Sequence, residues 1–228
     1  MRRKRVRFVA AGLGLGVLVA GAAACGPSDA QAARAGASGQ DTEPTVSAPS
    51  PGVKAAGQVG GDGSPCRLPV SFDLAPGWEP KAVTHVGDEQ FASLFEQGGT
   101  TLACEISAKA SGNIGFLRVW VADQPVTAGD ARGVLEAFMT GERTSGGSPV
   151  YTDLKTGAGG GELPTVQVAY ETAALDEPKQ ESAFAVVTPA GEGVVVHLGG
   201  LDSTEHEQML PAFRLARQSL KAAPQPTP

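Results

Sequence analysis

Residues 166–198 read VQVAYETAALDEPKQESAFAVVTPAGEGVVVHL, and apolar side chains alternate along three short segments of this stretch. The segments are Val166–Tyr170, Phe184–Thr188 and Val194–Leu198. A period of two is typical of a β-strand with one face buried. Short polar loops separate the segments, so the stretch predicts three consecutive antiparallel strands.

The same alternation recurs toward the amino end of the chain. It is clear at 68–74, 102–108, 117–121 and 150–154, and weaker at 83–86. Two segments instead show the helical period: residues 128–140, which end before Gly141, and a segment that starts near Ser203. A shorter helix is expected over 88–97. Because strands outnumber helices and no βαβ rhythm appears, we expect an α+β domain with a central antiparallel sheet flanked by helices.

The amino terminus has the layout of an export signal. Basic residues at positions 2–7 precede 17 uncharged residues, Phe8–Ala24, which lead to small residues and Cys25. The uncharged segment is short for a membrane span and contains four glycines, so a retained span is the weaker alternative. We therefore expect residues 1–24 to be a signal peptide.

The residues around this junction resemble the lipobox of bacterial lipoproteins. Ala22-Ala23-Ala24 precedes Cys25, and Gly26 follows it. The resemblance implies that the Cys25 thiol receives diacylglycerol, that palmitate is added, and that the protein is anchored to the outer, extracytoplasmic face of the cell membrane. Lipoproteins more often have Leu where Ala22 stands. The alternative is cleavage by ordinary signal peptidase and a secreted protein with a free Cys25.

Composition divides the remaining chain into three parts. Residues 25–64 are rich in Ala, Gly, Ser and Pro and lack aromatic side chains, which predicts a disordered linker after the anchor. Residues 65–221 carry the strand and helix patterns and form the expected folded domain. Residues 222–228 are short and Pro-rich, so we expect a frayed tail.

Two cysteines remain inside the expected domain, Cys66 and Cys104. An even pair in an exported chain is expected to form a disulfide. Each cysteine lies on the apolar face of a predicted strand, which supports the pairing. A redox pair or metal thiolates are the alternatives, although the C-x-x-C spacing typical of both is absent.

The charge balance excludes nucleic acid as a partner. The chain has net charge -6, and five of its 18 basic residues lie within the first seven positions. Without residues 1–24, 13 basic residues face 24 acidic ones, which gives a net charge of -11. Nucleic acid binding needs clustered Lys and Arg against phosphates.

The start of the expected domain carries a resemblance to a known family. Leu68-Pro-Val-Ser-Phe-Asp-Leu-Ala-Pro-Gly-Trp78 is a strand that runs into Pro-Gly-Trp, and the chain closes with a helix over 210–220. These features resemble PsbP-like domains, the fold of the Ran-binding Mog proteins and of the LpqN-type lipoproteins of actinobacteria. The resemblance implies a central antiparallel sheet between helices, used for binding or assembly, without shared catalytic residues.

The sequence contains no complete catalytic motif. There is no Walker loop and no Gly-x-Ser-x-Gly elbow, and the glycine run at 157–161 lacks the last glycine of a dinucleotide fingerprint. His206-Glu207 begins like a zincin motif but has Leu210 where the second His must stand, so a solvated first helical turn is expected. His197 is expected to be a sheet-face residue with ordinary hydrogen bonds. His85, near Asp88 and Glu89, is a loose metal-binding alternative.

One face of a predicted strand suggests a contact surface. Phe116, Arg118 and Trp120 alternate with Leu117 and its apolar neighbours, and aromatic and Arg side chains are enriched at interface hot spots. The alternative is that a helix covers this face and buries Trp120. Trp78 is a further candidate for the surface, with packing at a turn as its alternative.

Together these observations predict a lipid-anchored binding or interaction protein of the bacterial cell envelope. We expect no catalysis, no catalytic residue, no metal and no cofactor. Its partners would be the membrane, through Cys25, and an envelope protein or small ligand. The alternatives are a carrier of apolar small molecules or lipids, which needs a cavity of several hundred Å³, and an envelope enzyme. The enzyme alternative needs a His beside two carboxylates in a cleft.

Overall fold

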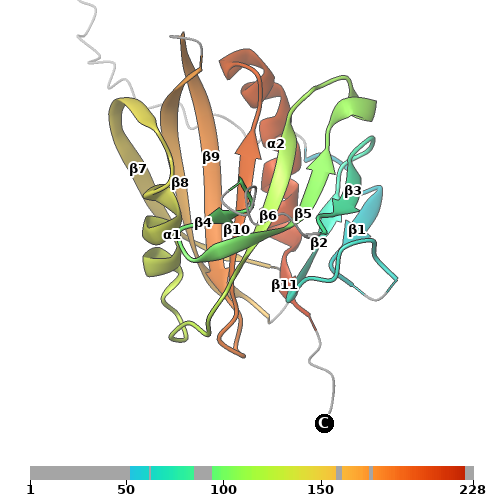
Figure 1. Cartoon of the computed structure of the whole chain (residues 1–228). Coiled ribbons are helices and arrows are strands. Elements are labelled where there is room, and N and C mark those ends of the chain that lie inside the picture. The colour runs from blue at the N-terminus through green and yellow to red at the C-terminus, as the bar shows by residue number, and fades with distance from the viewer. Residues whose placement is uncertain (1–51, 62, 85–93, 158–160, 175–176, 224–228) are drawn as a thin grey trace, which may run out of the picture. The chain divides into compact units, whose positions relative to one another are not determined.

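Antiparallel strands dominate the structure (Figure 1). The computed structural model describes residues 52–61, 63–84, 94–157, 161–174 and 177–223, all of which belong to one compact unit, residues 48–228. The expected signal peptide, Cys25, His85 with Asp88 and Glu89, and residues 224–228 of the expected tail lie outside the described residues.

The larger sheet has eight strands among the described residues, in the order β3-β5-β6-β10-β9-β8-β7, with β4 paired to β5. Neighbouring strands of this sheet pair antiparallel throughout the described residues. The three consecutive strands predicted from residues 166–198 are confirmed as β8, β9 and β10. The strand bounds are β3 (Glu79–Ala82), β4 (Glu96–Gln97), β5 (Thr100–Ser107), β6 (Phe116–Ala122), β7 (Thr144–Thr156), β8 (Leu163–Ala174), β9 (Glu177–Val187) and β10 (Gly193–Gly199).

A smaller sheet has the order β1-β2-β11, with β1 (Gly57–Val59), β2 (Val70–Leu74) and β11 (Lys221–Ala222). Its first strand corrects the expected linker, because residues 57–59 pair with β2 and Val59 is fully buried. Backbone hydrogen bonds and one buried side chain hold this three-residue strand. It is therefore too short to show an alternating pattern in the sequence. At the other end, Ala222 pairs with β2 and extends the domain by one residue beyond position 221.

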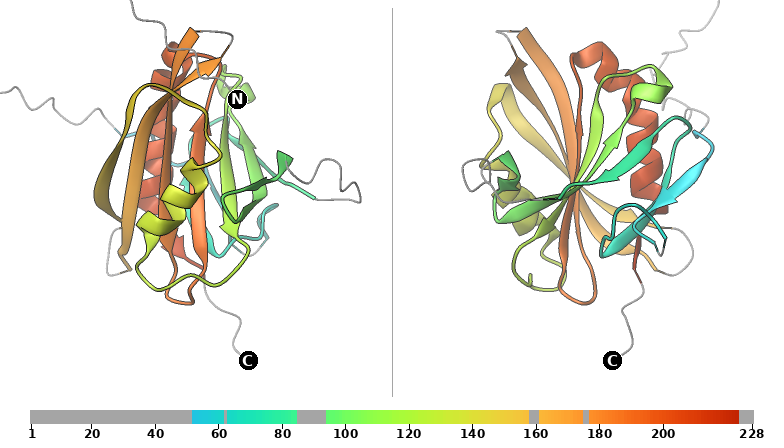
Figure 2. Two further views of the ribbon diagram at one scale, coloured as in Figure 1. Left: turned by 60° about the vertical axis from the view of Figure 1, so that its left-hand side comes forward. Right: turned by 45° about the vertical axis from the view of Figure 1, so that its right-hand side comes forward.

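Two α-helices lie on opposite faces of the larger sheet (Figure 2). They are α1 (Ala131–Met139) and α2 (Ser203–Ser219), and a 3₁₀ turn, η2, covers Lys109–Ser111. Asp130 caps α1 by accepting the Gly133 N–H at 3.0 Å, so the helix starts later than expected. The short helix expected over 88–97 is wrong at its end, where Glu96–Gln97 form β4; residues 88–93 are not described.

The fold class is therefore mainly antiparallel β, which corrects the expectation of a balanced α+β domain. Eleven strands and two α-helices account for the described residues, apart from η2 and the connecting loops. Neither helix in this part of the chain is long and apolar enough to cross a membrane.

Each face of the larger sheet has its own hydrophobic core. On one face, α1 places Val134, Leu135 and Phe138 against the central strands. On the other face, α2 and the smaller sheet contribute side chains such as Phe213 and Phe72. Because β9 and β10 supply side chains to both cores, polar residues on these strands must find partners inside the protein.

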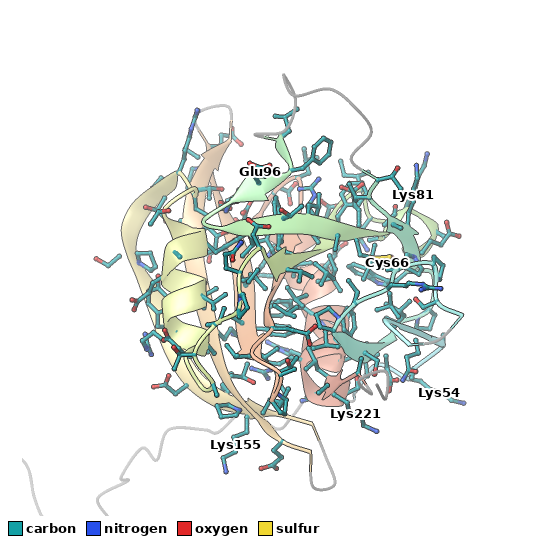
Figure 3. The ribbon with its side chains drawn as sticks, turned by 60° about the horizontal axis from the view of Figure 1, so that its bottom comes forward. Lys54, Cys66, Lys81, Glu96, Lys155 and Lys221 are labelled. Atoms are coloured by element: carbon teal, nitrogen blue, oxygen red, sulfur yellow. A yellow bond between two sulfur atoms is a disulfide. The ribbon has the colours of Figure 1, made fainter. Side chains whose placement is uncertain are left out.

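The predicted disulfide between Cys66 and Cys104 is present, with Cα atoms 5.8 Å apart (Figure 3). Cys104 lies in β5 of the larger sheet, whereas Cys66 lies in the loop before β2. Both cysteines are buried. The bond therefore links the smaller sheet covalently to the larger one.

Reduction of this disulfide is expected to lower the free energy of unfolding by about 4 kcal/mol, because it frees a long loop in the unfolded chain. Urea unfolding with and without dithiothreitol measures the change. A chain that carries both Cys66→Ala and Cys104→Ala is the control and should not respond to the reductant. Equal stability of the reduced and oxidised wild-type protein would contradict a structural role.

Gly98 is predicted to be intolerant of a side chain, since its φ is +58° and a methyl group there would collide with the backbone of Ala137 and Phe138 at the end of α1. The neighbouring Gly99 also has a positive φ, of +77°, but faces open space. Gly98→Ala should therefore destabilise the protein by about 1–3 kcal/mol more than Gly99→Ala, which carries only the backbone penalty of about 1–2 kcal/mol. Equal thermal unfolding of the two variants would show that α1 does not pack closely on this turn.

Candidate functional site

Two of the four residues expected at a contact surface lie on an open part of the sheet. Phe116 and Arg118 are half-buried on β6, and the Arg118 guanidinium lies 5.2 Å from the centre of the Phe116 ring. The Arg118 Nε donates to Glu105 at 3.0 Å. Both side chains already have partners within the protein, so this surface is small and internally satisfied.

The two tryptophans do not belong to such a surface, which corrects that expectation. Trp120 is 6% exposed and packs edge-on against Phe138 of α1, with ring centres 5.6 Å apart. Trp78 is also buried, in a turn that its backbone N–H closes on the Ala75 carbonyl. A helix covers the β6 face at Trp120, as the alternative interpretation required.

A buried polar cluster lies on the same face of the sheet as α1. The His197 Nε2 is 2.9 Å from Glu181 Oε2 and 3.0 Å from the Tyr170 hydroxyl, which itself donates to Glu181 Oε2 at 3.2 Å. The register of β8, β9 and β10 brings these residues together, since Tyr170 is opposite Glu181 and His197 is opposite Ala183. All three side chains are buried.

Two further side chains complete the cluster. Lys179 Nζ contacts the other oxygen of Glu181 at 2.5 Å and donates to the Gly200 carbonyl at 2.9 Å. Glu142, in the turn after α1, has a carboxylate oxygen within 4.8 Å of the facing Glu181 and His197 atoms. Gln97 holds the Glu142 carboxylate by donating to Oε1 at 2.6 Å. The cluster therefore joins the central strands to the end of α1.

The cluster shifts the titration of its members. Burial alone would raise the pKa of Glu181, but the hydrogen bond and charge of His197, with those of Lys179, hold this pKa low, at about 2. Burial raises the pKa of the Tyr170 hydroxyl far above its ordinary value, and the charges of Glu142 and Glu181 add to the effect. At neutral pH the cluster thus holds a carboxylate at Glu181 and a protonated phenol at Tyr170.

His206 is buried, which corrects the expectation that it lies in a solvated helical turn. It is 4% exposed on α2, with its Nε2 3.2 Å from the Ser182 hydroxyl on β9. Burial lowers the pKa of His206 to about 4. The negative charge of Glu181 opposes this shift, whereas the charges of His197 and Lys179 add to it. The chain places this position one turn inside α2, against the sheet, while Glu207 beside it is exposed.

A cleft of about 610 Å³ opens beside the disulfide. The loop that carries Cys66, the end of β3, and parts of β5 and β6 form its walls. Eight of its twelve lining residues are apolar; the full set is Ser64, Pro65, Arg67, Pro69, Ala82, Val83, Thr101, Leu102, Ala103, Val121, Ala122 and Asp123.

An irregularity in β5 shapes this cleft. The pairing of β5 with β6 shifts register between Leu102 and Cys104, and the Ala103 carbonyl accepts the Val83 N–H at 3.1 Å. A bulge of this kind bends a strand and redirects its side chains. As a result Leu102 belongs to the core under α1, whereas Cys104 faces the opposite core.

The charged side chains of the cleft differ in whether they have a partner among the described residues. Asp123 accepts from the Thr101 hydroxyl at 2.5 Å. Arg67 is exposed, and its guanidinium forms no ion pair with any of the described residues. The cleft can therefore hold an apolar body, and it presents the Arg67 guanidinium to a polar or anionic end.

Sequence reasoning identified His197 but missed its partners. Glu181 and Lys179 lie in a stretch interpreted as a loop and strand start, and Glu142 lies just after a predicted helix. Their proximity depends on strand register and on how α1 ends, which local patterns do not encode. The one available signal was the alternation that placed His197 opposite the apolar face of its strand.

We predict that His206 makes the folded state less stable as pH falls from about 6.5 to about 4. The unfolded chain binds a proton at this side chain over that range, whereas the folded protein keeps it neutral, so stability is present above the unfolded pKa and is lost below it. The loss is on the order of 2 kcal/mol. Urea unfolding from pH 7.5 to pH 4.5 should show the wild type losing more stability than His206→Gln. Parallel pH curves for the two chains would contradict the assignment.

Comparisons with known proteins agree with the export features of the sequence. No curated protein matches the chain. The solution structure of cyanobacterial PsbP from Synechocystis is similar, with 11% sequence identity, coverage of 68% of this chain and 86% of that chain, and a TM-score of 0.41. One family model matches residues 36–220, which is most of the chain. The chain therefore belongs to the family described as "Uncharacterised lipoprotein".

Proposed function

We propose that the protein is a lipid-anchored, extracytoplasmic binding protein of the bacterial cell envelope, held at the membrane through Cys25 and without catalytic activity. Membership of a lipoprotein family supports the anchor, and the Ala22-Ala23-Ala24-Cys25 junction supplies its attachment residue. A PsbP-like domain of the kind found in LpqN-type lipoproteins is the finer assignment within this proposal.

The cleft beside the disulfide is the observation that carries the binding role. Its volume of about 610 Å³ lies within the range of small-molecule sites, and most of its lining is apolar. The disulfide fixes one wall, because Cys66 belongs to the loop that lines the cleft and Cys104 belongs to β5. A wall that is already ordered reduces the entropy lost on binding. The ligand is a small molecule with an apolar body and an anionic end that faces Arg67.

The buried cluster is the observation that favours an enzyme instead, since His197 does lie beside two carboxylates. However, the His197 and Glu181 side chains are only 8% and 7% exposed. Their polar atoms contact each other, Tyr170 and Lys179, and none of these residues lines the cleft. This enclosure supports a non-catalytic role for the cluster.

Mass spectrometry of the membrane-extracted protein tests both the anchor and the ligand. The expected denatured mass begins at Cys25, carries added acyl chains and lacks the two hydrogens of the disulfide. The native mass is expected to be larger by one small ligand, which denaturation releases. An unmodified Cys25 would contradict the anchor, and the lack of a native adduct would count against a carried ligand.

A defined probe tests the cleft itself. The dye 8-anilinonaphthalene-1-sulfonate has an apolar body and an anionic end, and it should bind the folded protein at one saturable site. Arg67→Glu removes the cation and Ala103→Leu fills the cleft, so each should weaken binding at least fivefold. Lys155→Glu makes the same charge change at an exposed position outside the cleft and should leave binding unchanged. Equal binding by all four proteins would exclude the cleft.

A further inference from the structure

We propose that the buried cluster at the end of α1 is a binding site for a first-row divalent metal ion of the zinc class, with His197 Nε2, Glu181 Oε2 and a Glu142 oxygen as its ligands. This site is separate from the cleft, and its occupancy does not depend on the proposed ligand-binding function.

The three donor atoms lie close to the spacing that one coordination sphere requires. All of them are within 4.8 Å of one another, and the two buried ones, His197 Nε2 and Glu181 Oε2, are 2.9 Å apart. Zinc bonds to imidazole nitrogen and carboxylate oxygen are about 2.0–2.2 Å long, which places tetrahedral ligand atoms about 3.4 Å apart. A small movement of the half-buried Glu142 side chain would bring its oxygen to bonding distance from an ion held by His197 and Glu181.

The cluster has fewer hydrogen atoms available for hydrogen bonding than it has close polar contacts. His197 Nε2, Glu181 Oε2 and the Tyr170 hydroxyl are mutually 2.9–3.2 Å apart. One imidazole N–H and one phenol O–H supply at most two hydrogens to these three contacts. A metal ion in place of the His197 hydrogen satisfies the nitrogen and the carboxylate together, and the displaced proton passes to water.

Each carboxylate is also held by a second polar side chain. Gln97 Nε2 binds Glu142 Oε1 and also the Phe138 carbonyl, at 2.6 and 3.1 Å, so it fixes Glu142 to the last turn of α1. Lys179 binds Glu181 Oε1 and leaves Oε2 toward His197. Contacts of this kind orient metal ligands in known sites. The carboxyl end of α1 also lies at the cluster, and the helix dipole there favours a cation.

The charges around the donor atoms are compatible with a bound divalent cation. The two carboxylates of Glu142 and Glu181 face one nearby ammonium group, that of Lys179, which is already committed to Glu181 Oε1 and to a backbone carbonyl. Arg118, opposite His197 in the β6–β10 pairing, is neutralised by Glu105. The Tyr170 hydroxyl donates to Glu181 Oε2 at 3.2 Å and serves as a positioning residue.

The donor set selects the class of ion. Imidazole nitrogen with carboxylate oxygen suits zinc and its first-row neighbours, whereas Ca²⁺ and Mg²⁺ prefer all-oxygen sites. The half-buried Glu142 forms the entry side, while His197 and Glu181 are closed off by the sheet and by Phe138, whose ring centre is 5.8 Å from that of His197. An ion can enter such a site where a larger substrate has no room.

Isothermal titration with Zn²⁺ tests the site. The experiment uses the full chain in detergent and without a histidine tag. Cys25→Ser removes the one cysteine outside the disulfide, which would compete for the metal in any molecule where it is not acylated. We expect one Zn²⁺ per chain at micromolar affinity or better, and no comparable binding of Ca²⁺. Glu142→Gln should weaken Zn²⁺ binding at least tenfold, and His197→Gln should abolish it. Tyr170→Phe should weaken binding by a smaller factor, as expected for a positioning residue.

Glu162→Gln is the matched control, since Glu162 is exposed and pairs with Lys155 away from the cluster; it should bind Zn²⁺ like the wild type. Glu142 is half-buried in a turn, so its variant is expected to fold, and circular dichroism checks this. A Co²⁺-loaded protein should in addition show visible absorption bands that Glu142→Gln changes and Glu162→Gln does not. Absence of Zn²⁺ binding by the wild type, or equal affinity in Glu142→Gln and Glu162→Gln, would overturn the proposal.

Discussion

The central strands β9 and β10 are buried on both faces, and this constraint determines how their polar residues are used. A strand in the middle of a two-faced core cannot turn a polar side chain to water, so each must be paired within the protein. Glu181 and His197 pair with each other and with Tyr170 and Lys179, and Ser182 pairs with His206 on the opposite face. The buried cluster is thus a direct consequence of covering one sheet with layers on both sides.

The layers that cover the two faces of the larger sheet differ in size. Each candidate site lies at the edge of one of these layers. On one face α1 has only nine residues, and the cluster lies at its carboxyl end, where Glu142 is half-buried. On the other side of the domain, the loop before β2 is tied to β5 by the disulfide, and the shift of register after Leu102 opens the cleft beside it. One covalent bond and one bulge therefore define the cleft, while strand register and a helix end define the cluster.

The sequence predicts well those features that depend on local patterns. The alternation of β8, β9 and β10 and the apolar stripe of α1 identified these elements, because burial imposes a period on neighbouring residues. The even pair of cysteines predicted the disulfide, although Cys66 lies in the loop before β2 and not on a strand face as expected. Features that depend on distant pairing were not predictable in this way. Strand β1 has one buried side chain and no pattern, the burial of Trp120 depends on where α1 packs, and Glu142 reaches His197 only through the turn after α1.

Native-state hydrogen exchange is the measurement that tests most directly whether the doubly buried strands are the centre of the domain. Backbone amides of β9 and β10 are expected to exchange only through global unfolding, with protection that matches the full free energy of unfolding. The amides of β1 and of the loop around Cys66 should exchange through smaller, local openings. Fast local exchange in β9 or β10, at free energies well below the global value, would contradict this account.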